Sequence, residues 1–168
     1  MDTQSIYEIE FSGHSTKREW AVYIIIVIDN KSDKRKLYVG KVGDNRDGCN
    51  PILSRIGNHF SLNKIHSQLR NKIVDTTLFD YRVLYSIFGE YNKSNHSQDR
   101  QKINQIERQL NLLIQDKASD NFELLNPYKG IGVTKKVLLE RKGLLTEKEI
   151  YTLTQMAERA LSIDKPSR

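Results

Sequence analysis

The sequence predicts an α+β fold with a small, mainly antiparallel β-sheet flanked by helices. Three observations support it: two apolar runs joined by a polar turn, a later segment of strict alternation, and two segments with apolar residues at helical spacing. A chain of 168 residues, 38% hydrophobic and 29% charged, has the size and composition of one globular domain. We therefore expect residues 1–168 to form a single domain.

The first predicted elements are strands. Residues 6–11 alternate weakly between polar and apolar side chains, which predicts a short edge strand. Residues 20–28 are apolar on both faces and rich in β-branched side chains, which is typical of a strand covered on both sides. The polar segment 29–36 predicts a turn, after which residues 37–42 return as the partner strand.

A helix is predicted next, with Asn50 as its N-cap and Pro51 at its first position. Its inward face is marked by apolar residues four apart, namely Ile52, Ile56 and Phe60. Gly57 weakens this helix, so we expect a break near residues 62–63 and a second helical piece at 65–73.

Three more elements complete the expected fold. Residues 79–87 alternate strictly and predict a strand. Residues 99–117 predict a long helix with an apolar stripe made by Ile103, Ile106, Leu110, Leu113 and Ile114. Thr146 and Glu149 form a capping box that predicts a last helix reaching Ile163. The basic segment between these two helices, residues 129–143, carries no clear signal.

Charge and cysteine content limit the classes of function. A net charge of +6 and a pI near 9.3 favour polyanionic partners, although only modestly. The single cysteine, Cys49, cannot form an internal disulfide, which fits a reducing cytoplasm. The acidic N-terminus does not resemble a signal peptide, and the longest apolar run, residues 21–28, is far shorter than the roughly 18 residues needed to cross a bilayer. We expect a cytoplasmic protein without a membrane partner.

Four polar side chains lie at unusual positions in the predicted fold and are candidates for a functional role. Tyr23 and Tyr38 lie one in each strand of the predicted hairpin, and they share a face if the numbers of opposed residues sum to an odd number. The sequence leaves this register open. Arg55 and His59 lie four residues apart on the predicted helix, so they share a face. A cation beside an imidazole suits a phosphate better than a core.

Glu107 is the fifth such residue. At about 100° per residue it lies about 40° from Ile103, at the border of the apolar stripe, where a carboxylate needs a cation or a metal ion. A single carboxylate with waters and a substrate phosphate is a common way to hold Mg²⁺. Each of the five residues also has an ordinary structural role open to it, as core phenol, solvated helix face or surface ion pair. Their order along the chain favours function.

That order resembles the GIY-YIG nuclease superfamily. The segment AVY, residues 21–23, stands where the family has GIY, and YVG, residues 38–40, stands for YIG. RIGNH, residues 55–59, matches the family's arginine followed four residues later by histidine. Glu107 takes the place of the metal-binding glutamate, and Asn126 resembles the asparagine that closes the motif set.

The resemblance covers residues 19–128 as a β-β-α-β-α core and leaves residues 129–168 as a basic segment and a helical C-terminal extension. The chain departs from the family pattern in three places. Ala21 replaces the first glycine, and the loop before Arg55 is longer than the family's usual one. The gap from Glu107 to the asparagine is also long, so Asn121 is an alternative to Asn126.

The resemblance implies hydrolysis of DNA with one divalent metal ion, Mg²⁺ or Mn²⁺, held by Glu107. Arg55 then offsets charge on the phosphoryl oxygens. Tyr38 helps to deprotonate the attacking water, with Tyr23 and His59 as hydrogen-bonding partners or alternative bases. A phenol has an ordinary pKa of about 10, so a phenolate needs positive charge nearby.

Substrate contacts are expected from several further places. Lys41 and Arg55 are the candidates for the positive charge beside the phenols, and Lys41 and Asn126 are expected to contact the substrate. Residues 42–50 and the basic segment 129–136 are expected to touch DNA. Two other functions stay open: a catalytically inactive nucleic-acid-binding domain of the same fold, and a protein-interaction domain. The oligomeric state and the biological role, in restriction, repair or mobile DNA, are left open by the sequence.

Overall fold

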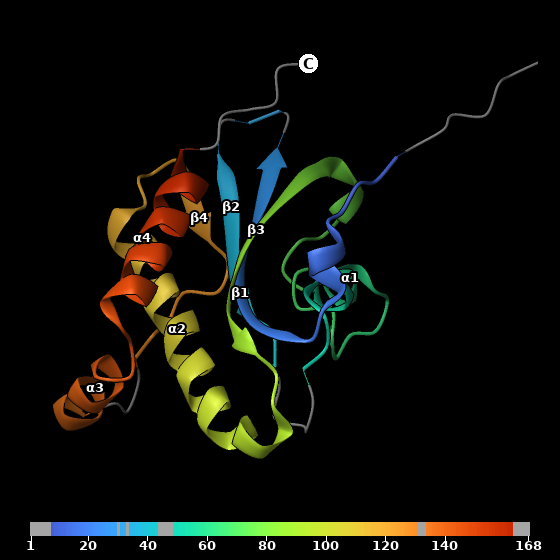
Figure 1. Ribbon diagram of the computed structural model, residues 1–168. Helices are drawn as coiled ribbons and strands as arrows, with labels where there is room; N and C mark the ends of the chain where they lie inside the picture. The colour runs from blue at the N-terminus through green and yellow to red at the C-terminus, as the bar shows by residue number, and fades with distance from the viewer. Residues whose placement is uncertain (1–7, 30, 33, 44–48, 131–133, 163–168) are drawn as a thin grey trace, which may run out of the picture.

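The computed structural model describes residues 8–29, 31–32, 34–43, 49–130 and 134–162. These residues form one four-stranded sheet in the order β3-β1-β2-β4 (Figure 1). The strands are β1 (Glu19–Asp29), β2 (Arg35–Lys41), β3 (Phe79–Glu90) and β4 (Phe122–Leu124). β1 pairs antiparallel with both β2 and β3, and β4 runs parallel to β2. The predicted α+β class with a mainly antiparallel sheet is confirmed.

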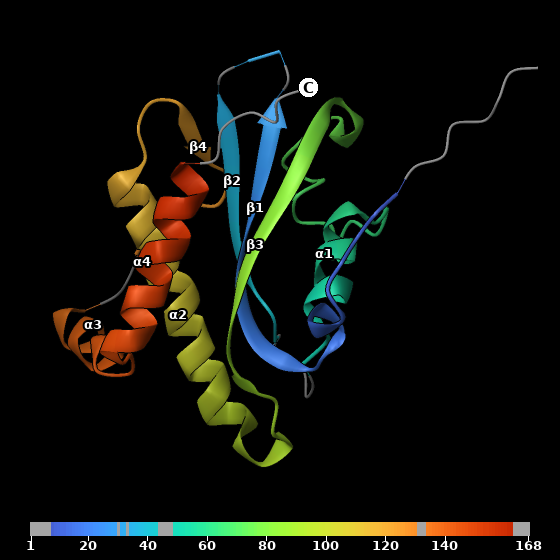
Figure 2. The same cartoon turned by 45° about the horizontal axis from the view of Figure 1, so that its top comes forward.

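Helices cover both faces of this sheet. α2 (His96–Lys117) and α4 (Glu147–Leu161) pack together on one face, and α1 (Ile52–Phe60) lies on the other (Figures 1 and 2). α3 (Lys135–Lys142) is a short helix that precedes α4. β1 is buried along nearly its whole length because it is central in the sheet and covered from both sides.

Four of the five residues of the predicted α2 stripe are buried, the fifth, Leu113, is half-buried, and the unpredicted Gln105 and Asn111 are buried with them. Ile103, Ile106, Leu110 and Ile114 are buried against the sheet. The capping box of the last helix is also confirmed, because the Thr146 N–H donates to Glu149 Oε2 at 2.8 Å and the Glu149 N–H donates to Thr146 Oγ1 at 3.3 Å. No helix within the described ranges is long and apolar enough to span a bilayer.

The register of the hairpin answers the question that the sequence leaves open. Tyr23 lies opposite Gly40 and Tyr38 lies opposite Ile25, so the numbers of opposed residues sum to the odd value 63. Both phenols therefore lie on the same face of the sheet. This is the face that α1 covers, since His59 of α1 contacts both rings.

Three predicted elements are wrong or shifted. Residues 8–11 form no strand, and Ile9 is 86% exposed, so no neighbouring strand covers it; residues 6 and 7 lie outside the described part of the chain. Residues 65–73 form turns instead of a helix. There the Arg70 N–H donates to the His59 carbonyl at 3.3 Å and Asn71 Nδ2 donates to the Lys64 carbonyl at 2.8 Å, and neither bond belongs to a regular helix.

The start of α1 is displaced by one residue from the prediction. Pro51, and not Asn50, is its N-cap, and no side chain caps its first turn. Two elements were not predicted: β4, which is three residues long, and α3 within the basic segment. Of the expected DNA-contacting segments, residues 44–48 and 131–133 lie outside the described part of the chain.

Candidate active site

Tyr23 lies directly across the hairpin from Gly40. The Tyr23 side chain is fully buried, and its ring lies over the Gly40 backbone so closely that a Cβ atom at Gly40 would overlap the ring and the hydroxyl. Any side chain at position 40 would therefore push the ring aside. The glycine of YVG is needed here for close packing, and it determines where the Tyr23 hydroxyl lies.

A Gly40→Ala variant tests this packing. We expect the free energy of unfolding to fall by about 1–3 kcal/mol, because the added methyl group overpacks the buried ring. Gly57→Ala is the matched control, since a Cβ at Gly57 meets nothing within 4 Å in the middle of α1. That variant should be more stable by about 0.5–1 kcal/mol. Urea unfolding of both variants is the measurement, and equal effects would contradict the close contact.

His59 of α1 joins the two phenols in one buried cluster, which we call the Tyr-His cluster (Tyr23, Tyr38 and His59). The Tyr23 hydroxyl and His59 Nε2 are 2.6 Å apart. The His59 ring meets the Tyr38 ring edge-on, with centroids 4.8 Å apart, and the Tyr23 ring with centroids 5.6 Å apart. His59 is 0% exposed, and its Nδ1 has no hydrogen-bond partner among the described residues.

Burial and the nearby charge of Arg55 together determine the protonation states of His59 and Tyr23. Burial and then the Arg55 guanidinium lower the pKa of His59 from 6.5 to about 4, so the imidazole is neutral near pH 7. Burial raises the pKa of Tyr23 far above its ordinary value, and the charge of Arg55 opposes that shift. Tyr23 is therefore a neutral phenol.

The permanent charge of Arg55 assigns the direction of one hydrogen bond to the Tyr23 hydroxyl. Arg55 contacts the Tyr23 hydroxyl through a side-chain hydrogen bond, and a guanidinium can only donate. The phenol oxygen therefore accepts from Arg55. The direction of the bond between the Tyr23 hydroxyl and His59 Nε2 depends on the imidazole tautomer: the phenol donates when the ring proton is on Nδ1, and His59 donates when it is on Nε2.

The depressed pKa of His59 makes folding stability depend on pH. An imidazole that titrates at about 4 when folded and near 6.5 when unfolded stabilises the fold fully above pH 6.5 and progressively less as the pH falls toward 4. We expect the wild type to lose roughly 2–3 kcal/mol more than a His59→Gln variant between pH 7 and pH 4. Parallel urea titrations at several pH values measure this difference. Identical pH profiles for the two proteins would show that His59 is not buried in its neutral form.

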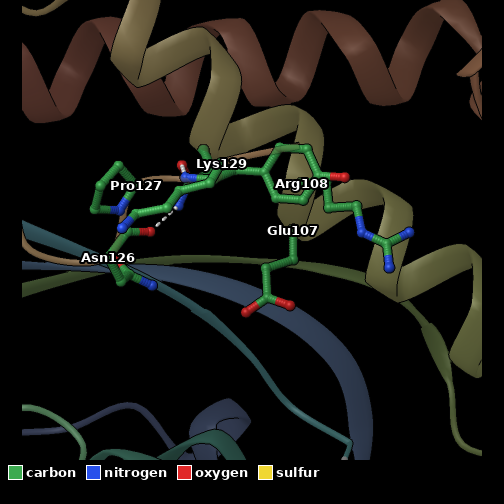
Figure 3. Close-up of a pocket in the computed structure, with 7 residues that line it drawn as sticks. Glu107, Arg108, Asn126, Pro127 and Lys129 are labelled. Atoms are coloured by element: carbon green, nitrogen blue, oxygen red, sulfur yellow. Dashed lines mark hydrogen bonds between the residues drawn. The ribbon is translucent and has the colours of Figure 1, made fainter. Parts of the chain in front are cut away.

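Glu107 of α2 lies within electrostatic range of the same cluster. Its charge acts on the Tyr23 phenol, as do Arg55 and Tyr38. The side chain is half-buried at the edge of the α2 stripe and lines an open pocket of about 380 Å³ (Figure 3). Tyr38, Arg55 and His59, from β2 and α1, thus lie around the Tyr23 phenol of β1, and Glu107 of α2 is near enough for its charge to act on that phenol.

Asn126 holds the edge of β2 beside this site. Its Oδ1 accepts from the Val39 N–H at 3.0 Å, and its Nδ2 donates to the Val39 carbonyl at 2.7 Å, so the amide extends the sheet where β4 ends. Asn121 lies at the opposite end of β4, where its carbonyl accepts from the Arg35 N–H at 2.9 Å. Of the two asparagines, Asn126 is the one next to YVG. Its amide pairs with the Val39 backbone, and its contact with the substrate stays a prediction.

Lys41 is not brought to the cluster, which corrects the sequence-based expectation. Side chains alternate along β2, so Lys41 points to the face opposite Tyr38. Its Nζ donates to the Gly43 carbonyl at 2.6 Å. Arg55 is the cation that lies beside the phenol.

Asn111 is a buried polar residue of the site that the sequence did not single out. It is 5% exposed, and its Nδ2 donates to the Asn126 carbonyl at 2.8 Å while its Oδ1 accepts from the Tyr128 N–H at 2.8 Å. It therefore fastens the segment after β4 to α2. An asparagine beside Leu110 in the buried stripe was the available signal, because a buried amide needs partners.

Comparison of the chain with protein-family models, with curated proteins and with solved structures gave no match.

Proposed function

We propose that this protein is a metal-dependent endonuclease of the GIY-YIG type that hydrolyses phosphodiester bonds of DNA. The observation that carries the proposal is that Tyr38, Arg55 and His59 lie around the buried Tyr23 phenol, with the Glu107 carboxylate near enough for its charge to act on it. These residues are far apart in sequence and come from four different elements. A phosphoryl-transfer site needs their chemistry: a cation for the phosphate, a carboxylate for a metal ion, and proton acceptors.

Glu107 fits the role of a ligand to Mg²⁺ or Mn²⁺. Its carboxylate is a hard oxygen donor, it is half-buried, and it lines an open pocket with room for waters and a phosphate (Figure 3). The described residues contain no group of three or more His, Cys, Asp or Glu side chains, so the proposed site is of the single-carboxylate kind. A bound divalent ion supplies Lewis-acid stabilisation of the phosphate and the leaving oxygen.

Arg55 provides the second positive charge. Its guanidinium touches the Tyr23 hydroxyl and lies near enough to His59 to lower the pKa of that imidazole. A group in this position stays charged throughout the reaction and presents a planar fork of donors to phosphoryl oxygens. Its role is to stabilise the charge that develops on the phosphate.

Tyr38 is the residue we assign to the attacking water. A general base must reach water, and Tyr38 is 7% exposed, whereas Tyr23 and His59 are each 0% exposed. The hydrogen-bonded pair of Tyr23 and His59 is the alternative, because the neutral imidazole can accept a proton relayed through the phenol.

Two phenylalanine variants separate these routes. We expect Tyr38→Phe to lower kcat by about 10²-fold or more, the usual contribution of general-base catalysis, and Tyr23→Phe to lower it much less. Single-turnover cleavage of an end-labelled oligonucleotide measures both. If Tyr23→Phe has the larger effect and Tyr38→Phe is nearly silent, the base is the Tyr23 and His59 pair.

DNA is the proposed substrate because the chain carries a net charge of +6, which favours polyanions. The test is conversion of supercoiled plasmid to open-circular or linear DNA with Mg²⁺ or Mn²⁺, against an EDTA control. Metal-dependent conversion supports the proposal. Salt-sensitive binding without cleavage under any metal would favour an inactive nucleic-acid-binding domain, and neither binding nor cleavage would favour a protein-interaction domain.

A further inference from the structure

Glu107 lines a pocket whose other lining residues have no role in the proposed catalytic cluster. Glu107, Arg108 and Asn111 line it from α2, and residues 126–129 line it from the segment after β4 (Figure 3). Its volume of about 380 Å³ is in the range of pockets that bind small organic groups. Tyr23, Tyr38, Arg55 and His59 are not among its lining residues.

The walls of this pocket are held in place by hydrogen bonds between α2 and the segment after β4. Asn111 bonds to both Asn126 and Tyr128, as described above. The Tyr128 N–H also donates to Gln115 Oε1 at 3.2 Å. Because the segment after β4 is tied to α2 at several points, little conformational entropy remains to be lost when a ligand binds there.

Two cations border this pocket. Arg108 lies with its guanidinium carbon 6.0 Å from the centre of the Tyr128 ring, and Lys129 is exposed at the rim. Within the described part of the chain, neither side chain forms an ion pair. Two cations that lack a protein carboxylate, placed one on each side of a pocket beside Glu107, suit an anionic ligand.

We propose that Arg108, Tyr128 and Lys129 form a phosphate subsite for the nucleotide next to the scissile bond. The inference rests on the proposed function, since it places the scissile phosphate at Glu107 and the neighbouring phosphate in this pocket. Lys129 acts as a point charge, and Arg108 presents its donor fork from a position set by the Tyr128 ring. The substrate class is therefore a polynucleotide strand that continues past the cleaved bond, and not an isolated phosphodiester.

Binding without cleavage is the first test. Fluorescence anisotropy of a short labelled DNA oligonucleotide is measured in EDTA at several salt concentrations, for the wild type, Arg108→Gln and Lys129→Gln. Each variant should bind about 10-fold more weakly. The slope of log affinity against log salt should fall by about 0.7–0.9 for each lost phosphate contact. Lys117→Gln is the matched control: it removes the same charge from α2, at a side chain that pairs with Glu158, and its affinity and slope should stay at the wild-type values.

Tyr128→Leu tests whether the ring positions Arg108. Tyr128→Leu should lower the affinity for DNA by the same factor as Arg108→Gln. The double variant that carries both substitutions should bind DNA no more weakly than either single variant. The inference is overturned if Arg108→Gln and Lys129→Gln match the Lys117→Gln control in affinity and slope. Because this assay needs no catalysis, loss of binding in these variants sustains the subsite even if the protein cuts no DNA.

A kinetic comparison separates the subsite from the catalytic cluster in an active enzyme. Arg108→Gln should lower kcat/KM for the oligonucleotide about 10-fold and lower that for bis(p-nitrophenyl) phosphate by a much smaller factor. Glu107→Gln should abolish both activities. Equal losses of Arg108→Gln on the two substrates would assign Arg108 to the reacting phosphate and overturn the subsite.

Discussion

A Glu107→Gln variant is expected to lose at least about 10³-fold in kcat for DNA cleavage, because an amide cannot replace a carboxylate as an anionic ligand to a divalent cation. The fold should survive the change. The side chain is half-buried at the edge of the α2 stripe, and glutamine has the same shape, so the free energy of unfolding should shift by less than about 1 kcal/mol. Cleavage rates under saturating Mg²⁺ and urea unfolding of the same preparations measure the two quantities.

Glu123→Gln is the matched control for that substitution. Glu123 lies on β4 opposite Lys36, where its exposed carboxylate is 3.7 Å from Lys36 Nζ. This variant should cleave DNA at the wild-type rate, because an exposed ion pair contributes little. Equal activity of Glu107→Gln and Glu123→Gln would remove Glu107 from the mechanism.

Replacement of Arg55 by lysine should cost about 10²–10³-fold in kcat, although the charge is kept. Lysine offers a point charge in place of the planar fork that donates to Tyr23 and, by proposal, to the phosphate. Arg159→Lys, at an exposed position on α4, is the control and should have no effect. A fully active Arg55→Lys variant would contradict a bidentate role.

An Arg55→Gln variant adds a readout that does not depend on catalysis. The Arg55 charge helps to hold the pKa of His59 down, so removing it should raise that pKa above its value of about 4. NMR titration of the imidazole in wild type and variant measures the shift. An unchanged His59 pKa would show that Arg55 does not lie against the Tyr-His cluster.

The sequence predicted the elements whose signals are local. Alternation and apolar runs gave β1, β2 and β3, helical periodicity gave the α2 stripe, and the capping box gave the start of α4. These patterns depend on neighbours within a few residues along the chain. Tyr23, Arg55 and Glu107 were indicated by a different signal, their order along the chain, since no local pattern separates them from ordinary structural residues.

The features that the sequence did not predict depend on distant partners. Within residues 65–73, the Arg70 N–H donates to the His59 carbonyl of α1 and Asn71 Nδ2 donates to the Lys64 carbonyl, which are partners that a regular helix would not use. β4 is too short to give a pattern, and it is a strand because β2 lies beside it. The face of the sheet on which the Lys41 side chain lies depends on the register of the hairpin. A shift of one residue in that register would move the side chain to the other face.

The most direct measurement of the central claim is digestion of a genomic DNA library with purified protein, followed by sequencing of the ends. The proposal predicts new ends that appear with Mg²⁺ or Mn²⁺, carry 5′-phosphate and 3′-hydroxyl groups, and are absent with EDTA or with the Glu107→Gln protein. Their sequences also report strand polarity and site preference. A library that stays intact with every metal ion, or one that Glu107→Gln protein cuts as well as wild type, would contradict the account.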